Sequence, residues 1–174
     1  MRFEEILKEK FLYTKNKNLF KIIYFIIQKL KKNKHRKISY SGGGIDLIIE
    51  HYFRNKEKGV YIDVGAYHPV MGNNTFKLFN KGWSGINIDL DFHTIDIFNN
   101  FRPNDDNIIS AVSDTIEKKE LYFHHNRSAI NTLEKNKGGK SKEIREIQTN
   151  TLNNIIENSQ YKEPEIDFVS IDVE

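Results

Sequence analysis

An α/β fold built around a parallel sheet is the architecture that this sequence predicts. Short β-branched and apolar runs at 60–64, 84–90 and 107–113 alternate with segments of helical patterning. A further apolar strand is expected at 166–173. Neighbouring parallel strands need a long connection, and a helix supplies it, so the alternation indicates right-handed strand–helix–strand crossovers.

The first predicted element is a helix in an N-terminal extension. Leu19 to Leu30 form an apolar segment interrupted by Lys21, and a basic run follows at 31–37. Twelve residues rising about 1.5 Å each reach roughly 18 Å, short of the roughly 30 Å hydrocarbon core, so we expect no membrane span. Two interpretations stay open. Residues 19–37 form an interfacial helix whose basic tail meets anionic head groups, or the helix packs on the body or on a partner subunit of a homo-oligomer.

The glycine-rich stretch 41–44 separates this extension from the body of the chain. Serine and glycine favour turns and linkers, so we predict a helical extension over 1–40 and one domain over 41–174. Apolar residues recur at helical spacing from 45 to 53, and a helix is expected there, before the first strand of the sheet.

Capping residues set the bounds of two helices between the strands. One helix is predicted over 74–80, closing with Gly82, and another over 92–101. Asp91 can accept hydrogen bonds from the first free N–H groups of the second helix, and Pro103 cannot continue it.

The stretch after the third strand is less regular. Residues 118–124 alternate like a half-exposed strand, 126–142 have the composition of a loop, and 143–148 are predicted as a short edge strand. Thr151 is a suitable N-cap for a short helix that ends near Ile156, before the final strand.

Composition narrows the function classes. The 174 residues are the size of one domain, and the net charge of +3 comes largely from lysines in the first forty residues, so we expect no nucleic-acid binding. Cysteine is absent, which excludes disulfides and thiolate chemistry. Glu4 and Glu5 stand where a signal peptide has basic residues, so we expect a cytoplasmic protein, peripheral to the inner face of the membrane if the helix is interfacial. His124 and His125 would face opposite sides of a strand, so no metal site is proposed.

Polar residues and acids follow each predicted strand of the sheet. In an open parallel sheet, ligands bind beyond the carboxyl ends of the strands. A glycine after the first strand lets a ligand approach the backbone, and an acid after the second can accept both hydroxyls of a ribose. Asp89 lies 26 residues after Asp63, near the roughly 20-residue interval of such folds, and suggests a nucleoside ligand. The residues at the four strand ends are Asp63, Gly65 and Ala66; Asp89 and Asp91; Ser113 and Asp114; Asp172 and Glu174.

Glycine spacing distinguishes two nucleoside cofactors. A dinucleotide fingerprint needs a tight glycine trio so that a helix N-terminus can hold pyrophosphate, but no glycine follows Gly65 until Gly72. Acids at the strand ends repel phosphate and suit a cationic sulfonium that also bears an ammonium group. The residues therefore favour S-adenosylmethionine (SAM) over NAD, and an NAD-dependent enzyme is kept as the weaker alternative.

The ordered series of motifs resembles the FkbM-type SAM-dependent methyltransferases. The resemblance covers about residues 41–174 and implies a Rossmann-like class I methyltransferase fold, with a parallel sheet that is incomplete here. The matching segments are Tyr61 to Pro69, Asn74-Thr75, Gly82 to Asp89, Arg102-Pro103, Ala111 to Asp114 and Ile166 to Glu174.

Carried over position by position, the resemblance implies a role for each strand end. Asp63 and Gly65, with the adjacent Ala66, would line the methionine part of SAM. Asp89 would hold the ribose. The adenine would be bordered by Ser113 and Asp114. Asp172 would face the reacting centre, and His68 is the other candidate to assist loss of a proton from the acceptor.

The implied reaction is O-methylation of a hydroxyl on a sugar, a polysaccharide precursor or a similar small molecule. Proteins of this family continue beyond the Asp-Val-Glu motif at 172–174, so we expect the chain to be a fragment that ends after the fourth core strand. The alternative function is a catalytically inactive remnant that uses its N-terminal helix as a membrane- or partner-binding module.

Overall fold

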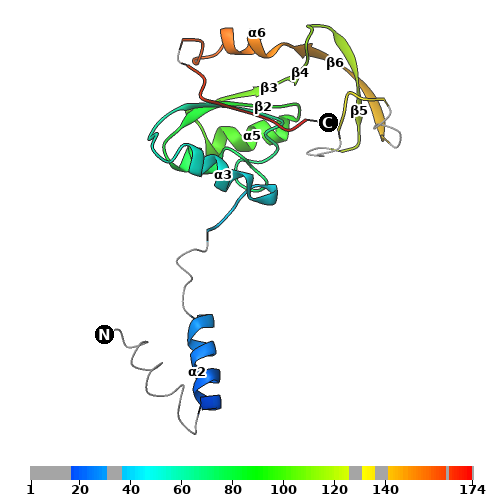
Figure 1. Ribbon diagram of the computed structural model, residues 1–174. Coiled ribbons are helices and arrows are strands. Elements are labelled where there is room, and N and C mark those ends of the chain that lie inside the picture. Colours follow the sequence, from blue (N-terminus) through cyan, green and yellow to red (C-terminus); the bar gives the residue numbers. More distant parts are fainter. Residues whose placement is uncertain (1–16, 31–36, 126–130, 136–140, 164, 174) are drawn as a thin grey trace. The chain divides into compact units, whose positions relative to one another are not determined.

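The computed structural model describes residues 17–30, 37–125, 131–135, 141–163 and 165–173. The chain divides into two compact units, 1–38 and 39–174. In the first unit the described element is helix α2, Lys17–Leu30, which agrees with the predicted helix (Figure 1). None of the helices in the described parts of the chain has the length and apolar character needed to cross a bilayer.

The second unit is built on a four-stranded parallel sheet in the order β3-β2-β1-β7 (Figure 1). This is the crossover arrangement that the alternation of strands and helices predicts. The strands are β1 (Val60–Val64), β2 (Ser84–Asp89), β3 (Asp106–Ile109) and β7 (Phe168–Ile171).

Residues of β1 alternate between two buried faces of the sheet. On one face Ile62 and Val64 pack with residues of β2 and with Ile155 and Tyr161. On the other face Tyr61 packs with a cluster that includes Trp83. The sheet is therefore covered on both sides, as a parallel sheet requires.

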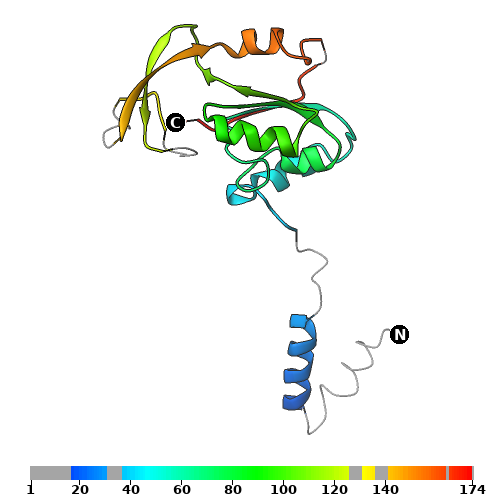
Figure 2. The ribbon, with the colours of Figure 1, turned by 180° about the vertical axis from the view of Figure 1, so that it is seen from behind.

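Short helices provide the two covers. On the face of Tyr61 lie 3₁₀ helix η1 (Gly42–Gly44), α3 (Ile45–Tyr52), α4 (Phe76–Asn80) and α5 (Phe92–Phe101), and α6 (Leu152–Glu157) lies on the opposite face (Figure 2). The predicted caps are confirmed. Asp91 accepts hydrogen bonds from the N–H groups of His93 and Thr94, and Thr151 accepts one from Asn154.

The predicted strand at 107–113 is two strands that belong to different sheets. After β3 the N–H of Ser110 still donates to the carbonyl of Asp89. The chain then turns away, and β4 (Ala111–Val112) pairs with β6 (Glu143–Asn150) in a second sheet of order β4-β6-β5. Strand β5 (Lys118–Phe123) is antiparallel to β6.

The prediction of 143–148 as an edge strand is wrong. β6 is the central strand of the second sheet, because β5 occupies one side and β4 pairs with its last two residues on the other. Strand β4 has only two residues, too few to show the apolar–polar alternation by which a strand is recognised in a sequence.

Candidate functional site

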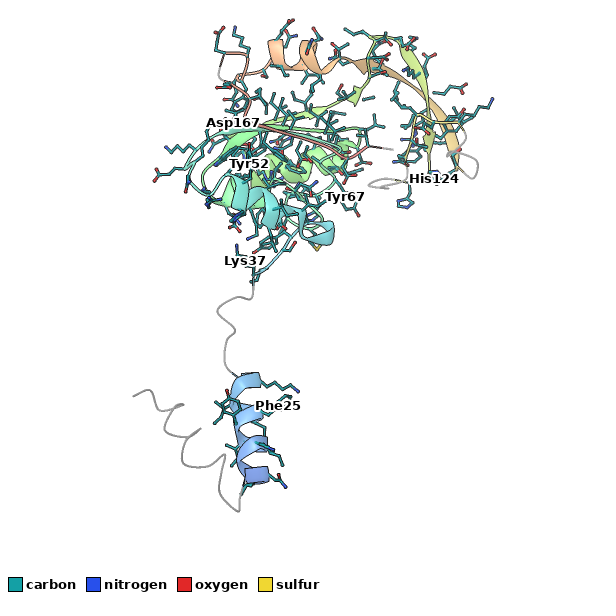
Figure 3. The ribbon with its side chains drawn as sticks, in the orientation of Figure 1. Phe25, Lys37, Tyr52, Tyr67, His124 and Asp167 are labelled. Atoms are coloured by element: carbon teal, nitrogen blue, oxygen red, sulfur yellow. The ribbon has the colours of Figure 1, made fainter. Side chains whose placement is uncertain are left out.

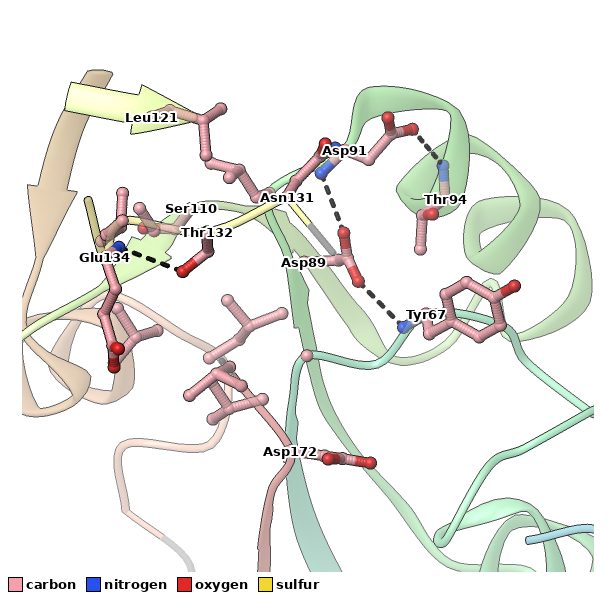
Figure 4. A pocket seen from close by; sticks show the side chains of 18 of the residues that line it. Tyr67, Asp89, Asp91, Thr94, Ser110, Leu121, Asn131, Thr132, Glu134 and Asp172 are labelled. Carbon is pink, nitrogen blue, oxygen red and sulfur yellow. Dashed lines mark hydrogen bonds between the residues drawn. The ribbon is translucent and has the colours of Figure 1, made fainter. Parts of the chain in front are cut away.

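A pocket of about 450 Å³ lies at the carboxyl ends of β1, β2 and β7. Its far wall comes from the second sheet and from the segment 131–134, which approaches the ends of the parallel strands (Figure 4). The residues that line it are Val64, Gly65, Tyr67, Gly72, Ile88, Asp89, Leu90, Asp91, Thr94, Ser110, Ala111, Val112, Leu121, Asn131, Thr132, Leu133, Glu134, Asp172 and Val173.

Gly65 forms the turn after β1 with a positive φ of 75°. A Cβ built there would lie 2.1 Å from the carbonyl oxygen of Asp172, so no other residue fits. The N–H groups of Gly65 and Ala66 both donate to the carbonyl of Ile88, at 2.9 and 3.1 Å. The glycine thus brings the ends of three strands together, and the chain's own Asp172 backbone occupies part of the space that the missing side chain leaves.

Asp89 lies at the centre of one wall, between Tyr67 and Asp91 (Figure 4). Its Oδ2 accepts the N–H of Tyr67 at 2.9 Å, and its Oδ1 accepts the N–H of Asp91 at 2.8 Å. Burial raises the pKa of Asp89, although these backbone donors lower it. Each carboxylate oxygen keeps a further lone pair, so the group can still accept two hydroxyl donors from a ligand.

Tyr67 is the one non-glycine residue with positive φ in the described chain, at 53°. Such a conformation costs free energy and persists where the surroundings hold it. Here the N–H of Tyr67 is held by Asp89, so the strained turn and the carboxylate fix each other's position.

The charged residues that the structure describes in the pocket wall are all acidic. Four carboxylates line it, those of Asp89, Asp91, Glu134 and Asp172, and no Lys, Arg or His is among the described lining residues. Apolar residues also line the pocket near Asp89, among them Ile88, Leu90 and Val112. The pocket therefore suits a cation that also carries a flat apolar group, and it disfavours a phosphate.

Thr94 contributes a hydroxyl that the sequence did not single out. The residue is 1% exposed, lines the pocket, and has no hydrogen-bond partner for Oγ1 within the described structure. A buried hydroxyl without a partner is costly, and here it borders a cavity. Its place in the first turn of α5, three residues after the N-cap Asp91, is the signal that could have found it.

The segment Asn131 to Glu134 also lines the pocket, although its sequence predicted only a loop. It is held on β5, because the N–H of Tyr122 donates to the carbonyl of Thr132 at 2.9 Å. The side chain of Asn131 accepts the N–H of His124. No local sequence pattern places these residues opposite the ends of β1 and β2, which lie far away in the sequence.

Asp63 lies behind the pocket and is not among the residues that line it. It is 3% exposed and accepts hydrogen bonds from Asn73 and Thr75, both at 2.9 Å. Burial raises the pKa of Asp63 to about 6, against the lowering effects of Thr75 and of the Arg102 guanidinium.

Arg102 ties this buried cluster to the loop after β1. Its Nη1 donates to Tyr61, Thr75 and Asn87. Its Nη2 donates to the carbonyl of Pro69 at 2.6 Å and to Asn73 at 2.9 Å. The loop that carries Tyr67 and Gly72 into the pocket is therefore anchored from below by one buried guanidinium.

The other predicted site residues lie at different distances from the pocket. Gly65, Asp89 and Asp172 line it, and Ala66 is buried next to Gly65 without lining it. Ser113 and Asp114 are not lining residues; Ser113 accepts a hydrogen bond from Lys119 and donates one to Asp114. Glu174 lies outside the described residues.

His68 is not a lining residue either. Its Nδ1 accepts the N–H groups of Val70 and Met71, both at 3.0 Å, so the ring closes the turn of its own loop. In the described residues no group of three or more His, Cys, Asp or Glu is placed to hold a metal ion.

Comparison with known proteins identifies one family. A family model described as a methyltransferase FkbM domain matches residues 63–174, which is more than half of the chain. A search of curated proteins and a search of solved structures found no match.

Proposed function

Because the chain belongs to the FkbM methyltransferase domain family, we propose that it transfers the methyl group of SAM to a hydroxyl of a sugar, a polysaccharide precursor or a similar small molecule. Family membership makes the protein a methyltransferase. The identity of the donor and the O-methylation of such an acceptor are our proposal.

The acidic pocket is the observation that carries the choice of donor. SAM bears a sulfonium and an ammonium group. A site with four carboxylates, and with no basic residue among the described residues that line it, attracts that charge. A dinucleotide would bring its pyrophosphate against the same carboxylates. The pyrophosphate could not bind at the glycine turn either, because the carbonyl of Asp172 occupies the space beside Gly65.

The residues present fit SAM at three points. Asp89, with one backbone donor on each oxygen, would accept the two ribose hydroxyls. The apolar residues Ile88, Leu90 and Val112 would contact the adenine. The methionine part, with its ammonium group, would lie toward Gly65 and Asp172. When bound, SAM supplies an electrophilic methyl group.

Asp172 is the lining carboxylate that we assign to the acceptor side. It is exposed at the end of β7, so an incoming hydroxyl can reach it. As the hydroxyl oxygen gains the methyl group, the bond between that methyl group and sulfur would break and leave a neutral thioether, and the carboxylate of Asp172 would accept the hydroxyl proton. The main task of the protein is to hold the two reactants in line and to exclude water.

Calorimetry with SAM tests the donor, and a radiolabelled methyl-transfer assay on a panel of sugars and other hydroxyl compounds tests the acceptor class. We expect SAM binding that NAD does not match, and transfer of label to a hydroxyl. A folded sample that binds NAD and not SAM contradicts the choice of donor. SAM binding without transfer to any hydroxyl would favour the inactive binding module.

Two substitutions separate the ribose contact from general charge. Asp89→Asn removes one acceptor and should weaken SAM binding about tenfold or more, because hydrogen bonds to charged groups contribute about 1.5–3 kcal/mol each. Asp96→Asn is the matched control, because it makes the same change at an exposed carboxylate on helix α5 that does not line the pocket. Equal SAM affinity in both variants would contradict the role of Asp89.

A further inference from the structure

Charge is distributed unevenly along this chain. Residues 17–37 contain eight Lys or Arg and no Asp or Glu. Residues 38–174 contain 15 Lys or Arg against 21 Asp or Glu. The modest net charge of +3 therefore hides a strongly basic segment attached to an acidic body. An anionic surface would attract the first and repel the second.

The basic segment includes helix α2, and α2 has a continuous apolar face. Leu19, Ile22, Ile23 and Ile26 follow the spacing i, i+3, i+4 and i+7, which places them on one side of a helix. Their exposed fractions are 60%, 59%, 46% and 48%, so this α2 apolar face is open to solvent. Exposed apolar faces of this kind mark a surface that binds something.

The opposite side of the helix carries Lys21 together with the aromatic residues Tyr24 and Phe25. At 100° per residue, Lys21 points away from the apolar face, and so does Phe25, which is 68% exposed (Figure 3). Lys29 is also exposed, in the last turn. An apolar face next to lysines, without any acid, is typical of a helix that lies in the plane of a membrane interface.

We propose that α2 binds the surface of an anionic lipid bilayer, lying parallel to it. The α2 apolar face enters the boundary between head groups and acyl chains, and the lysines contact anionic head groups. The 14 residues of α2 span about 21 Å at about 1.5 Å each, less than the roughly 30 Å hydrocarbon core, so the helix lies on the bilayer and does not cross it.

Charge favours lipid over a second copy of the chain as the occupant of this face. Two copies joined through α2 would bring two segments with eight basic residues each close together, and no acid within them could offset the repulsion. Anionic head groups neutralise the same charge, and each Lys or Arg near such a surface adds to binding.

Vesicle flotation with the full chain tests this inference. The protein is mixed with vesicles of phosphatidylcholine alone or of phosphatidylcholine with phosphatidylglycerol, at low and high salt. We expect flotation with the anionic vesicles, and a loss of about tenfold or more at high salt or with neutral vesicles, because both conditions remove the electrostatic attraction. A folded chain that does not float with anionic vesicles at low salt overturns the proposal.

Matched variants test which face of α2 is responsible. The double substitution Ile22→Gln/Ile26→Gln keeps helix-forming residues but removes half of the α2 apolar face, and should reduce flotation about tenfold or more. Phe25→Gln makes the same kind of change on the opposite side and should reduce it much less. Lys21→Gln/Lys29→Gln should weaken binding to anionic vesicles and flatten the salt dependence.

Two results for the apolar-face variant would contradict the inference. One is flotation equal to that of the unchanged chain. The other is an absence of flotation by both proteins, together with light scattering that shows a dimer for the unchanged chain and a monomer for the variant. The α2 apolar face would then join two copies of the chain. Melting temperature and SAM titration, measured on the same samples, show that the body is intact, so neither result bears on the proposed reaction.

Discussion

Thr94 and Thr75 are both fully buried, but only Thr75 has partners for its hydroxyl. Thr75 Oγ1 donates to Asp63 and accepts from Arg102, both at 2.9 Å. Thr94 Oγ1 has no partner in the described structure and borders the pocket. The same side chain therefore serves stability at one position and is available to a ligand at the other.

Thr94→Val is expected to weaken SAM binding about fivefold while leaving the free energy of unfolding nearly unchanged, because a neutral hydrogen bond contributes about 1 kcal/mol. Thr75→Val should do the reverse and lower the free energy of unfolding by about 1–3 kcal/mol, since it leaves buried polar partners unsatisfied. Calorimetry and chemical denaturation measure the two quantities. Unchanged SAM affinity in Thr94→Val would show that the hydroxyl does not contact the ligand.

The carboxyl of Asp63 should make stability depend on pH. Its pKa in the folded protein is about 6, above the ordinary value of 3.8, because burial disfavours the charged form. A raised carboxyl pKa means that the folded state holds the proton more tightly, so the stabilisation is present at low pH and is lost as pH rises through about 6.

Asp63→Asn should remove this component of the pH dependence. Between about pH 4.5 and 7 the free energy of unfolding of the unchanged protein should fall by about 2 kcal/mol relative to the variant. Denaturation of both proteins across that range gives the difference. A difference that stays constant with pH would mean that Asp63 does not titrate in this range.

The pairing of β1 with β2 depends on a close contact at Gly85. A Cβ built on Gly85 would lie 1.9 Å from the carbonyl oxygen of Tyr61, which is backbone and cannot move aside easily. Both strands of this pair end at the pocket, where Gly65 and Asp89 lie. A shift of one strand along the other would therefore move Asp89, the proposed ribose contact, relative to Gly65, the proposed methionine contact.

Gly85→Ala should destabilise the body by roughly 3 kcal/mol or more, because overpacking against backbone cannot relax. Gly42→Ala is the matched control, since a Cβ there meets nothing within 4 Å, and it should change stability little. Thermal melts of the two variants measure the difference. Equal melting temperatures would contradict the tight packing of β1 against β2.

The compact unit that begins at Ser39 includes residues just before the predicted domain start. Asp46 is fully buried, and its carboxylate accepts hydrogen bonds from Ser39, Tyr40 and Ser41. Burial would raise the pKa of Asp46, but these three donors outweigh it and hold the pKa below its ordinary value. The glycine-rich stretch predicted as a linker thus begins with a residue that is bonded to the body.

A fragment of residues 39–174 should melt within a few degrees of the full chain, because it keeps the donors to Asp46, but it should lose the flotation with anionic vesicles. A fragment of residues 45–174 should be less stable by about 3–5 kcal/mol, because it leaves a buried carboxylate without those partners. Thermal melts and flotation of both fragments measure this. Equal stability of the two fragments would contradict the importance of residues 39–41.

Local chemistry sufficed for much of the fold. The alternation of apolar strands and helices predicted the parallel sheet, and Asp91 and Thr151 predicted the starts of α5 and α6. The glycine after β1 and the acid after β2 predicted that Gly65 and Asp89 meet, and both line the same pocket. The helix starts depend on a few neighbouring residues. The meeting of Gly65 and Asp89 follows from the general rule that the carboxyl ends of parallel strands lie at one edge of the sheet.

The remainder of the pocket was decided by contacts between distant segments. The sequence alone determined the α/β class, the sheet and the acids at its edge. Only the tertiary structure decided that Asp63 is covered by Asn73 and Thr75 and that 131–134 forms part of the far wall. It also decided that the Thr94 hydroxyl has no hydrogen-bond partner among the described residues. The physical reason is that burial and hydrogen-bond partnership depend on which side chains meet in space, and a periodic pattern records only which way each one points.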